Sequence, residues 1–501
     1  MKDNIKQVSA KSAVFNYIGK TVGTIVDAAV FILLTKKLMI EDYGVYSFGL
    51  AILSFFGFFL SFGIPTTLVR FIPEYIQKQE RGIAFQIIKL SLRIVIIFGV
   101  FAIVSSFFIG GKVSVIFNTK PLSALFPLLV FVGISGIVLR IEEEILNALF
   151  MQAFRNIFQI CADSLKLFLF ILALNYGLGI NSLFLAVSLV TIIQLVFYSV
   201  RIFNYFPVVK SEKKLPKKEL RRFFTFSAKE YLFTITAFFW DMSFDIYVIT
   251  YLLGSAMTGL FNFAVSMSFF VLHWSPGVIL QPVISPLSVR QYAKAKDPAT
   301  LNKIFQFYNK LKAFFAFPVI LGSWSLVDKL VMVVYDNKFG PAVPALKILI
   351  ISVMIIAFTI PIRNIFDVLE KNEFALYSNI VIIYRICASL FLIKYFGITG
   401  AAYAYGTSML FIFLIQIAFL RRTIKVAYPM KSFLKILLNS SVMALFLIAL
   451  KPLIGNSLFL LVTIAISGVL IYLLLSCMNK PFKKEERNII NEGLGFAVWH
   501  F

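Results

Sequence analysis

Residues 167–200 read LFLFILALNYGLGINSLFLAVSLVTIIQLVFYSV, a run that contains no charged side chain. The run is too long for one membrane-spanning helix, which needs about 20 mostly apolar residues. Asn175-Tyr-Gly-Leu-Gly-Ile-Asn181 lies in its middle, and clustered Gly and Asn mark a chain reversal. The run therefore predicts a hairpin of two membrane helices. A second uncharged run, 246–289, predicts another, with its bend near Gly254 and Gly259.

The composition of the whole chain agrees with a membrane environment. Of its 501 residues, 60% are hydrophobic and 14% are charged, and Phe alone occurs 57 times. A soluble domain is roughly 45–50% apolar and about 25% charged. Only lipid is a suitable solvent for so much apolar surface, so a soluble enzyme is excluded.

The net charge of +24 raises the question of nucleic-acid binding. Such binding needs cations gathered in a stripe on a folded surface. Here the cations sit in short segments between apolar runs, which is the pattern set by membrane topology, so no nucleic-acid partner is expected. Three scattered cysteines and two histidines offer neither a disulfide framework nor a metal site. No metal and no cofactor is expected.

Apolar stretches of spanning length recur along the chain and predict an all-α membrane protein with about fourteen transmembrane helices. Their approximate ranges are 13–34, 44–69, 88–110, 122–141, 157–176, 181–201, 227–252, 258–285, 309–331, 345–367, 374–396, 398–420, 434–452 and 456–478. A polar segment, Met1–Lys11, precedes the first of them without a small-residue cleavage site. This indicates a retained first span and not a signal peptide.

The loops between these spans differ in their content of Lys and Arg. With a cytoplasmic N-terminus, one set of loops holds most of the cations, at 204–225, 290–296, 421–425 and 480–487. The opposite set holds far fewer. The positive-inside rule therefore predicts a multi-pass protein of the cytoplasmic membrane with both termini in the cytoplasm.

An internal repeat is visible at a constant offset. Gly44-Val-Tyr-Ser-Phe48 opens the second span and Gly259-Leu-Phe-Asn-Phe263 the eighth, and Ser12-Ala13 and Ser227-Ala228 have the same offset of 215 positions. Six spans per repeat give both halves one orientation and a pseudo-two-fold axis along the membrane normal. The expected parts are an N-lobe of six helices at 1–203, a basic cytoplasmic linker at 204–225, a C-lobe of six helices at 226–425, two further helices at 426–480 and a cytoplasmic tail at 481–501.

Two segments carry a family resemblance. Asp42-Tyr-Gly-Val-Tyr-Ser-Phe-Gly49 begins the second predicted span, and Ser61-Phe-Gly-Ile-Pro-Thr-Thr-Leu-Val-Arg-Phe-Ile-Pro-Glu-Tyr75 ends it. They resemble the Wzx-like polysaccharide-biosynthesis flippases of the multidrug/oligosaccharidyl-lipid/polysaccharide exporter superfamily. The resemblance implies two lobes facing a central cavity that opens alternately to each side. It also implies transport of a polyprenyl-diphosphate-linked oligosaccharide, with membrane lipids and polysaccharide assembly proteins as partners.

Cations inside predicted spans are candidates for substrate binding, because a charge at mid-membrane costs about 2.5–3.5 kcal/mol and rarely faces lipid. Lys20 shares a helix face with Asp27, and the two are expected to line a cavity, although each could instead pair with a neighbouring helix. Lys166 is expected to pair with Asp163, three residues before it. The remaining candidates are Arg70, which could instead snorkel to the interface, and Arg385, which could instead bridge two helices.

The candidate ion-coupling carboxylates are Asp27, Asp241 and Asp245. Asp241 and Asp245 are four residues apart and would stack on one face of a continuous helix, where two like charges in low dielectric favour uptake of a proton. The alternative is that each carboxylate meets a basic partner. Glu142-Glu143-Glu144 is expected to be a solvated helix end and not a catalytic cluster.

Three functions remain open: a flippase, a drug or cation exporter on the same fold, and a membrane-embedded polyprenyl-sugar polymerase or transferase. An enzyme needs an extramembrane loop with acid and base residues, but the longest outward loop is short, at about 333–347. The chain is therefore expected not to be an enzyme. Exporters of cations need an acidic cavity, whereas a diphosphate needs fixed cations, and the cations within the spans favour the flippase.

Overall fold

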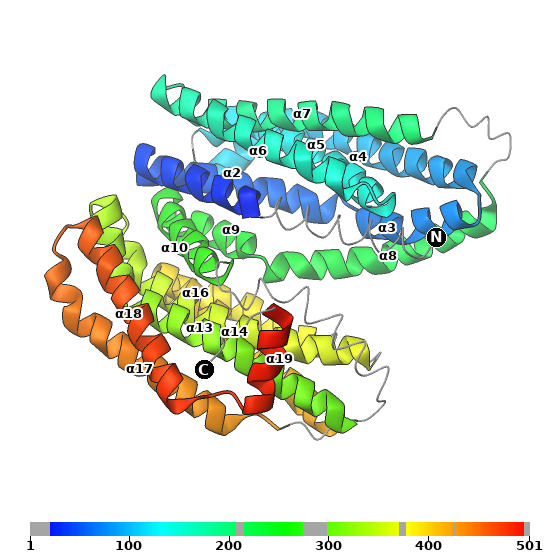
Figure 1. Ribbon diagram of the computed structural model, residues 1–501. Coiled ribbons are helices and arrows are strands. Elements are labelled where there is room, and N and C mark those ends of the chain that lie inside the picture. The colour runs from blue at the N-terminus through cyan, green and yellow to red at the C-terminus, as the bar shows by residue number, and fades with distance from the viewer. Residues whose placement is uncertain are drawn as a thin grey trace. The chain divides into compact units, whose positions relative to one another are not determined.

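The computed structural model describes residues 21–119, 121–206, 215–273, 298–369, 377–423, 427–494 and 501. In those residues the secondary structure is helical and no strand occurs (Figure 1). By its contacts the chain divides into two compact units, Met1–Gly259 and Leu260–Phe501. The lobe boundaries and the repeat inferred from the sequence remain predictions.

The first unit is built around α5. Its elements are a helix over residues 21–37, α2 (Ile40–Phe59), α3 (Ile64–Gln77), α4 (Arg81–Ile116), α5 (Leu122–Ala148), α6 (Gln152–Asn175), α7 (Gly179–Tyr205), α8 (Lys217–Trp240), α9 (Met242–Leu253) and the start of α10 (Ser255–His273). Helix α5 packs against α2, α3, α4 and α7. Its buried aliphatic residues, among them Ile141 and Ile145, join the main hydrophobic cluster of the unit. Helices α8 and α9, which follow the basic linker, pack on α2 and α3 and so belong to this unit.

The first predicted hairpin is confirmed, and the second predicted run breaks at Gly254, while its residues 274–289 lie outside the described residues. Helix α6 ends at Asn175 and α7 begins at Gly179, and between them Gly177 has a φ of +65°. Gly254, with a φ of +84°, separates α9 from α10. Glycine adopts positive φ without a steric penalty, which explains why the chain reverses at these positions.

The predicted span 44–69 is wrong as a single helix. The chain breaks between α2 and α3, where Gly63 adopts a φ of +68° and Pro65 occupies the first turn of α3. A Cβ on Gly63 would lie 2.4 Å from the carbonyl oxygen of Ser227 on α8. The Gly-Ile-Pro sequence thus ends one helix, starts the next and lets α8 approach the break.

The predicted span 227–252 is also broken. Helices α8 and α9 meet at a 52° bend. Asp241 has an extended backbone there and caps α9 by accepting a hydrogen bond from the Ser243 amide at 2.8 Å. An Asp side chain stabilises a helix start in this way because it satisfies an orphan amide. Asp241 and Asp245 therefore do not lie on one continuous helix, which removes the premise that they stack on one face.

Helices α2 and α10 approach each other through a reciprocal glycine contact. A Cβ on Gly44 would lie 1.8 Å from the carbonyl oxygen of Ser255, and a Cβ on Gly259 would lie 2.3 Å from that of Ile40. Gly44 and Gly259 are the two positions that the sequence repeat equates, as are Ile40 and Ser255. This reciprocity supports the repeat.

The second unit is organised around α13. Its elements are the remainder of α10, α13 (Pro298–Tyr335), α14 (Val343–Val368), α16 (Val381–Thr423), α17 (Met430–Leu450), α18 (Leu458–Asn479) and α19 (Lys484–Leu494). Helix α13 packs against α14, α17 and α18. In the tail, Glu486 of α19 accepts a hydrogen bond from the buried Lys310 of α13 at 2.7 Å.

Helix α16 is itself a hairpin. Gly397 has non-helical backbone angles and divides it into two arms. The arms lie side by side, since the Tyr384 hydroxyl on one donates to Thr407 on the other at 2.9 Å. These arms correspond to the predicted spans 374–396 and 398–420.

Within the described residues, ten helices are long and apolar enough to cross a membrane, and α8 with α9 would add an eleventh as a broken span. The all-α membrane class predicted from composition is confirmed.

Candidate functional site

The charged residues of α6 form a polar cluster with neighbouring helices. Nζ of Lys166 lies 3.1 Å from Oδ1 of Asp163, which confirms the predicted pair. It also lies 3.7 Å from Oδ1 of Asp27 on the helix over residues 21–37. Gln159 donates to Asp163, and Gln194 of α7 donates to Gln159, each at 3.1 Å. We call these five residues the Lys166 cluster.

The Lys166 cluster holds one cation between two carboxylates of unequal exposure. The Asp163 side chain is 13% exposed and that of Asp27 is 63% exposed. Asp27 is therefore the more distant and the more accessible counter-ion of Lys166. Lys20, which was expected to share a cavity with Asp27, lies outside the described residues.

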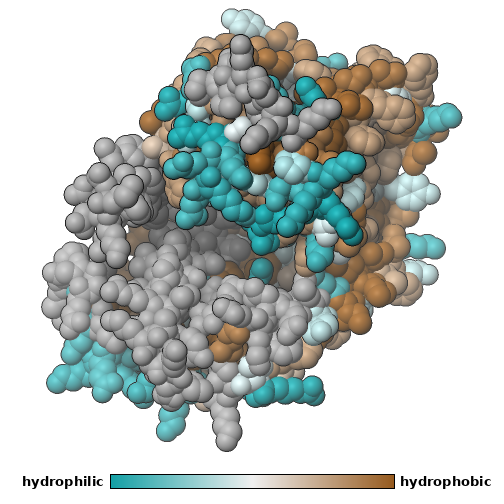
Figure 2. Space-filling model, turned by 90° about the vertical axis from the view of Figure 1, so that its right-hand side faces the viewer, coloured by the Kyte–Doolittle hydropathy of each residue, from teal (hydrophilic) through white to brown (hydrophobic). Residues whose placement is uncertain are grey.

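Arg70 lies in a second charged feature, between α3 and α8. Its guanidinium lies 4.5 Å from the centroid of the Phe226 ring. It borders a hollow of about 640 Å³ that we call the basic groove. The groove is lined by Arg70, Phe71, Lys217, Lys218, Arg221, Arg222, Thr225, Phe226 and Lys229. Figure 2 looks onto the end of the first unit where α8 begins and shows hydrophilic side chains gathered there.

Four contacts hold α8 against α3 and the break before it. Both terminal nitrogens of Arg222 donate to the carboxylate of Glu74 at 2.7 Å, and the Tyr75 hydroxyl donates to Glu219 at 2.6 Å. The hydroxyls of Ser227 and Tyr231 each donate at 2.8 Å to backbone carbonyls of the α2–α3 break. The hydrogen bonds from Arg222 lower the pKa of Glu74 to about 2. We call these contacts the α3–α8 clamp.

Arg385 lies on the first arm of α16 and is fully buried. Its guanidinium lies 4.9 Å from the centroid of the Tyr405 ring on the second arm. The charge is thus placed between the two arms of one hairpin in this structure. A contact with substrate remains a prediction for this residue.

The other candidate carboxylates have different environments. Asp241 is the helix cap described above, and Asp245 is fully buried in the first turn of α9. The expectation of a solvated Glu142 is wrong, because its side chain is 3% exposed and accepts a hydrogen bond from Ser199 of α7. Helix α5 continues to Ala148, beyond the predicted end of the span, and this extension buries the glutamate.

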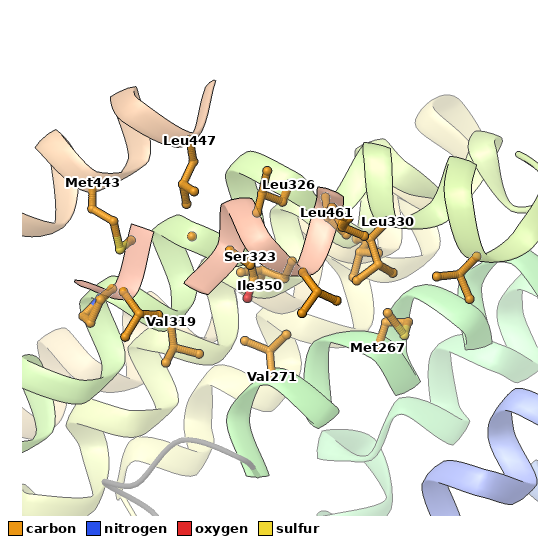
Figure 3. Close-up of a pocket in the computed structure, with 18 of the residues that line it drawn as sticks. Met267, Val271, Val319, Ser323, Leu326, Leu330, Ile350, Met443, Leu447 and Leu461 are labelled. Carbon is orange, nitrogen blue, oxygen red and sulfur yellow. The ribbon is translucent and has the colours of Figure 1, made fainter. Parts of the chain in front are cut away.

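The second unit contains an apolar pocket of about 410 Å³ between α10, α13, α14, α17 and α18. Figure 3 shows Met267, Leu330, Ile350, Met443 and Leu461 around it. Among the described residues that line it, Ser323 alone has a polar side chain. The pocket therefore suits a hydrocarbon chain.

Sequence comparison decides the family. Residues 33–344, more than half of the chain, match the family described as polysaccharide biosynthesis protein. The chain belongs to this family. The resemblance seen in the sequence is thus confirmed. A search of curated proteins finds no match.

Solved structures confirm the fold of this family member. A lipid II flippase, MurJ, in an inward closed conformation is similar with a TM-score of 0.74 and 16% identity, over 94% of this chain and 98% of that chain. An inward-facing multidrug resistance MATE family transporter of the MOP superfamily has a TM-score of 0.64 and 15% identity, over 80% and 94%. A MOP superfamily transporter from Pyrococcus furiosus has 0.54 and 13%, over 82% and 95%.

The sequence interpretation of this family member missed several of the residues described above. Glu74 and Tyr75 stand in the family motif without an assigned role, Arg222 is one of the cations of the basic linker, and no role is predicted for Glu219. Their spacing along the sequence cannot show that α3 and α8 are neighbours. Lys312 of α13 was also missed, although it is a cation within a predicted span. It is 2% exposed and donates to the Ala357 carbonyl at 3.1 Å.

Proposed function

We propose that the chain is a transporter that moves a polyprenyl-diphosphate-linked oligosaccharide across the cytoplasmic membrane for surface polysaccharide assembly. Membership of the polysaccharide biosynthesis family and a fold similar to a lipid II flippase support this proposal. The observation that carries it is the Lys166 cluster, because charges inside membrane helices border a water-filled path or a polar partner.

The unequal partners of Lys166 suggest how the cluster takes part in transport. A diphosphate bears more negative charge than one carboxylate and accepts charge-assisted hydrogen bonds. It would replace the accessible Asp27 at Lys166, while Asp163 keeps the ammonium in place on α6. Asp27, released from Lys166, would then be free to bind the coupling ion. This exchange gives Lys166 the substrate-binding role and Asp27 the ion-coupling role.

The hydrocarbon tail of the substrate also has a candidate binding surface in the chain. A polyprenyl tail needs an apolar surface, and the pocket of Figure 3 offers one of about 410 Å³ in the second unit. Transport would proceed by alternating access of a central cavity. Membrane lipids and polysaccharide assembly proteins are the expected partners.

The test is flipping of a fluorescent polyprenyl-diphosphate-linked oligosaccharide in proteoliposomes that contain the full chain. The variant is Lys166→Gln combined with Asp163→Asn, which removes the cation without leaving Asp163 unpaired. We expect initial rates at least about tenfold lower, equivalent to 1.4 kcal/mol. Lys394→Gln, an exposed lysine on α16, is the matched control and should keep the wild-type rate. Wild-type rates for the Lys166 variant would refute the role of the cluster.

The second candidate function is export of organic cations. It is favoured by the 63% exposure of the Asp27 side chain and by the excess of one carboxylate in the Lys166 cluster. It predicts efflux of a lipophilic cationic dye that Asp27→Asn abolishes, without flipping of the lipid-linked probe. Flipping without dye efflux would exclude it.

A further inference from the structure

The basic groove concentrates positive charge that the first unit leaves uncompensated. Of its six cations, Arg222 is bound to Glu74 and Glu219 by ion pairs. Within the part of the chain that the structure describes, no ion pair involves the other five, which are Arg70, Lys217, Lys218, Arg221 and Lys229. The described lining contains no carboxylate. An anion that enters the groove would therefore be attracted by several cations at once.

The groove is also built to a fixed shape. The α3–α8 clamp sets the spacing of its two walls, with 2.7 Å bonds from Arg222 to Glu74. Its floor is aromatic: Phe71 is 1% exposed and lies 4.8 Å from the Arg222 guanidinium, and Phe226 lies under Arg70. Cations held over aromatic rings keep their remaining donors directed outward. Because the clamp fixes the two helices that carry the cations, binding of an anion orders fewer groups and has a smaller entropic cost.

The neighbours of the groove indicate what kind of anion it takes. Val69 precedes Arg70 in the sequence and is 38% exposed, and Phe224 precedes Thr225 and is 42% exposed. The two helices that carry the cations thus also carry exposed apolar side chains, which matches a ligand that has a charged head and a hydrocarbon tail. Phosphate oxygens are the preferred acceptors of Arg and Lys. A hollow of about 640 Å³ is large enough for a lipid headgroup.

We propose that the basic groove between α3 and α8 binds the phosphate of a membrane-lipid headgroup. The phosphate lies among Arg221, Lys229 and Arg70. Two sources share this chemistry, an anionic phospholipid and a polyprenyl diphosphate. The site does not depend on the proposed transport function, because lipid binding there is measured without transport.

The experiment measures lipid binding to the purified full chain by native mass spectrometry. The probes are phosphatidylglycerol, a polyprenyl diphosphate and inorganic diphosphate. The variant Arg221→Gln/Lys229→Gln removes two exposed cations of the groove that take no part in the clamp. Lys431→Gln/Lys484→Gln removes the same charge from two exposed lysines of α17 and α19 and is the matched control. Lys217→Gln/Lys218→Gln is a second groove variant if the first one folds poorly.

We expect the groove variant to bind the lipid probes at least about tenfold more weakly than the control does. A loss for both lipids identifies a general phosphate-headgroup site. A loss for the polyprenyl diphosphate alone identifies a docking site for a lipid-linked diphosphate. Both results support the proposal. Equal lipid binding by groove and control variants, or a loss confined to inorganic diphosphate, would overturn it.

Discussion

Glu74 and Arg222 join α3 to α8 through one bidentate ion pair. The guanidinium matches both carboxylate oxygens at 2.7 Å, a geometry that lysine cannot reproduce. Because the pKa of Glu74 is lowered to about 2 from an ordinary 4.5, the folded state favours its ionised form. The pair therefore stabilises the fold fully above the ordinary pKa, and this contribution is lost as the pH falls towards 2.

Glu74→Gln should lower the melting temperature of the detergent-purified chain at neutral pH. The difference from wild type should be constant above about pH 5 and should shrink progressively below it, because protonation then removes the same charge from wild type. Thermal unfolding between pH 3 and pH 7 measures this. Glu80→Gln, at an exposed residue for which no ion pair is seen in the described part of the chain, is the control and should show little difference at any pH. A pH-independent difference for Glu74→Gln would contradict the assignment.

Arg385 has two possible roles, and substitution separates them. Arg385→Ala removes a fully buried side chain from between the arms of α16 and its contact with Tyr405, so membrane abundance should fall. Arg385→Lys keeps the charge but loses the planar fork. Quantitative immunoblotting measures the membrane abundance of each variant, and the flipping assay measures its transport rate. Normal abundance with lost transport would indicate substrate contact, and wild-type transport by a well-expressed Arg385→Ala variant would exclude it.

The sequence predicted those residue contacts that lie within one helix. Asp163 and Lys166 pair because three residues form almost one turn. The partners Asp27 and Lys166 lie far apart in sequence, as do Glu74 and Arg222, and hydropathy does not show which helices are neighbours. The break at Gly63-Ile-Pro65 had a local signal that the hydropathy of the surrounding apolar run obscured. Asp241 could likewise have been recognised as a helix cap before Ser243.

Gly44 of α2 and Gly259 of α10 stand at equivalent positions of the repeat, and the packing of these two helices explains why both are glycine. Each glycine admits a backbone carbonyl of the other helix at a distance that no Cβ allows. Small residues let helix backbones approach closely in membranes, where packing replaces the hydrophobic effect.

Gly44→Ala should therefore force α2 and α10 apart and lower the melting temperature by about 3 °C or more. Gly57→Ala, on the same α2, is the matched control, because a Cβ there meets no atom within 4 Å and alanine favours helix. Gly259→Ala should reproduce the effect of Gly44→Ala. Equal melting temperatures for Gly44→Ala and Gly57→Ala would show that the helices are not in contact at this position.

At the scale of the whole molecule, apolar run lengths predicted the number and class of the helices, and basic loops predicted their orientation. The solved relatives confirm the class and fold. The orientation of the helices in the membrane stays a prediction. Contacts divide the chain at Gly259, because α8 and α9 contact α2 and α3, and the lobe boundary at the basic linker stays a prediction. Hydropathy alone cannot predict such a division.

Cysteine labelling of intact cells tests the orientation. Cys161, Cys387 and Cys477 are free and exposed, so they must be replaced first. Lys218→Cys should be protected from a membrane-impermeant maleimide, whereas Lys338→Cys should react, because the positive-inside rule places them on opposite sides. Permeabilised cells, in which both should react, are the control. Labelling of both positions in intact cells would contradict the assigned topology.

The reciprocal glycine contact has the form of an isologous interface, in which each partner supplies the same surface to the other. A half-length ancestor with one such segment could have formed it by pairing with its own copy. Tandem fusion frees the two copies to diverge. Ser255 already donates to Glu41 at 3.4 Å, whereas the equivalent positions on the other side, Ile40 and Ala256, cannot form that bond. On the hypothesis of such an ancestor, the interface would have gained a polar bond on one side only, which a symmetric homodimer cannot do.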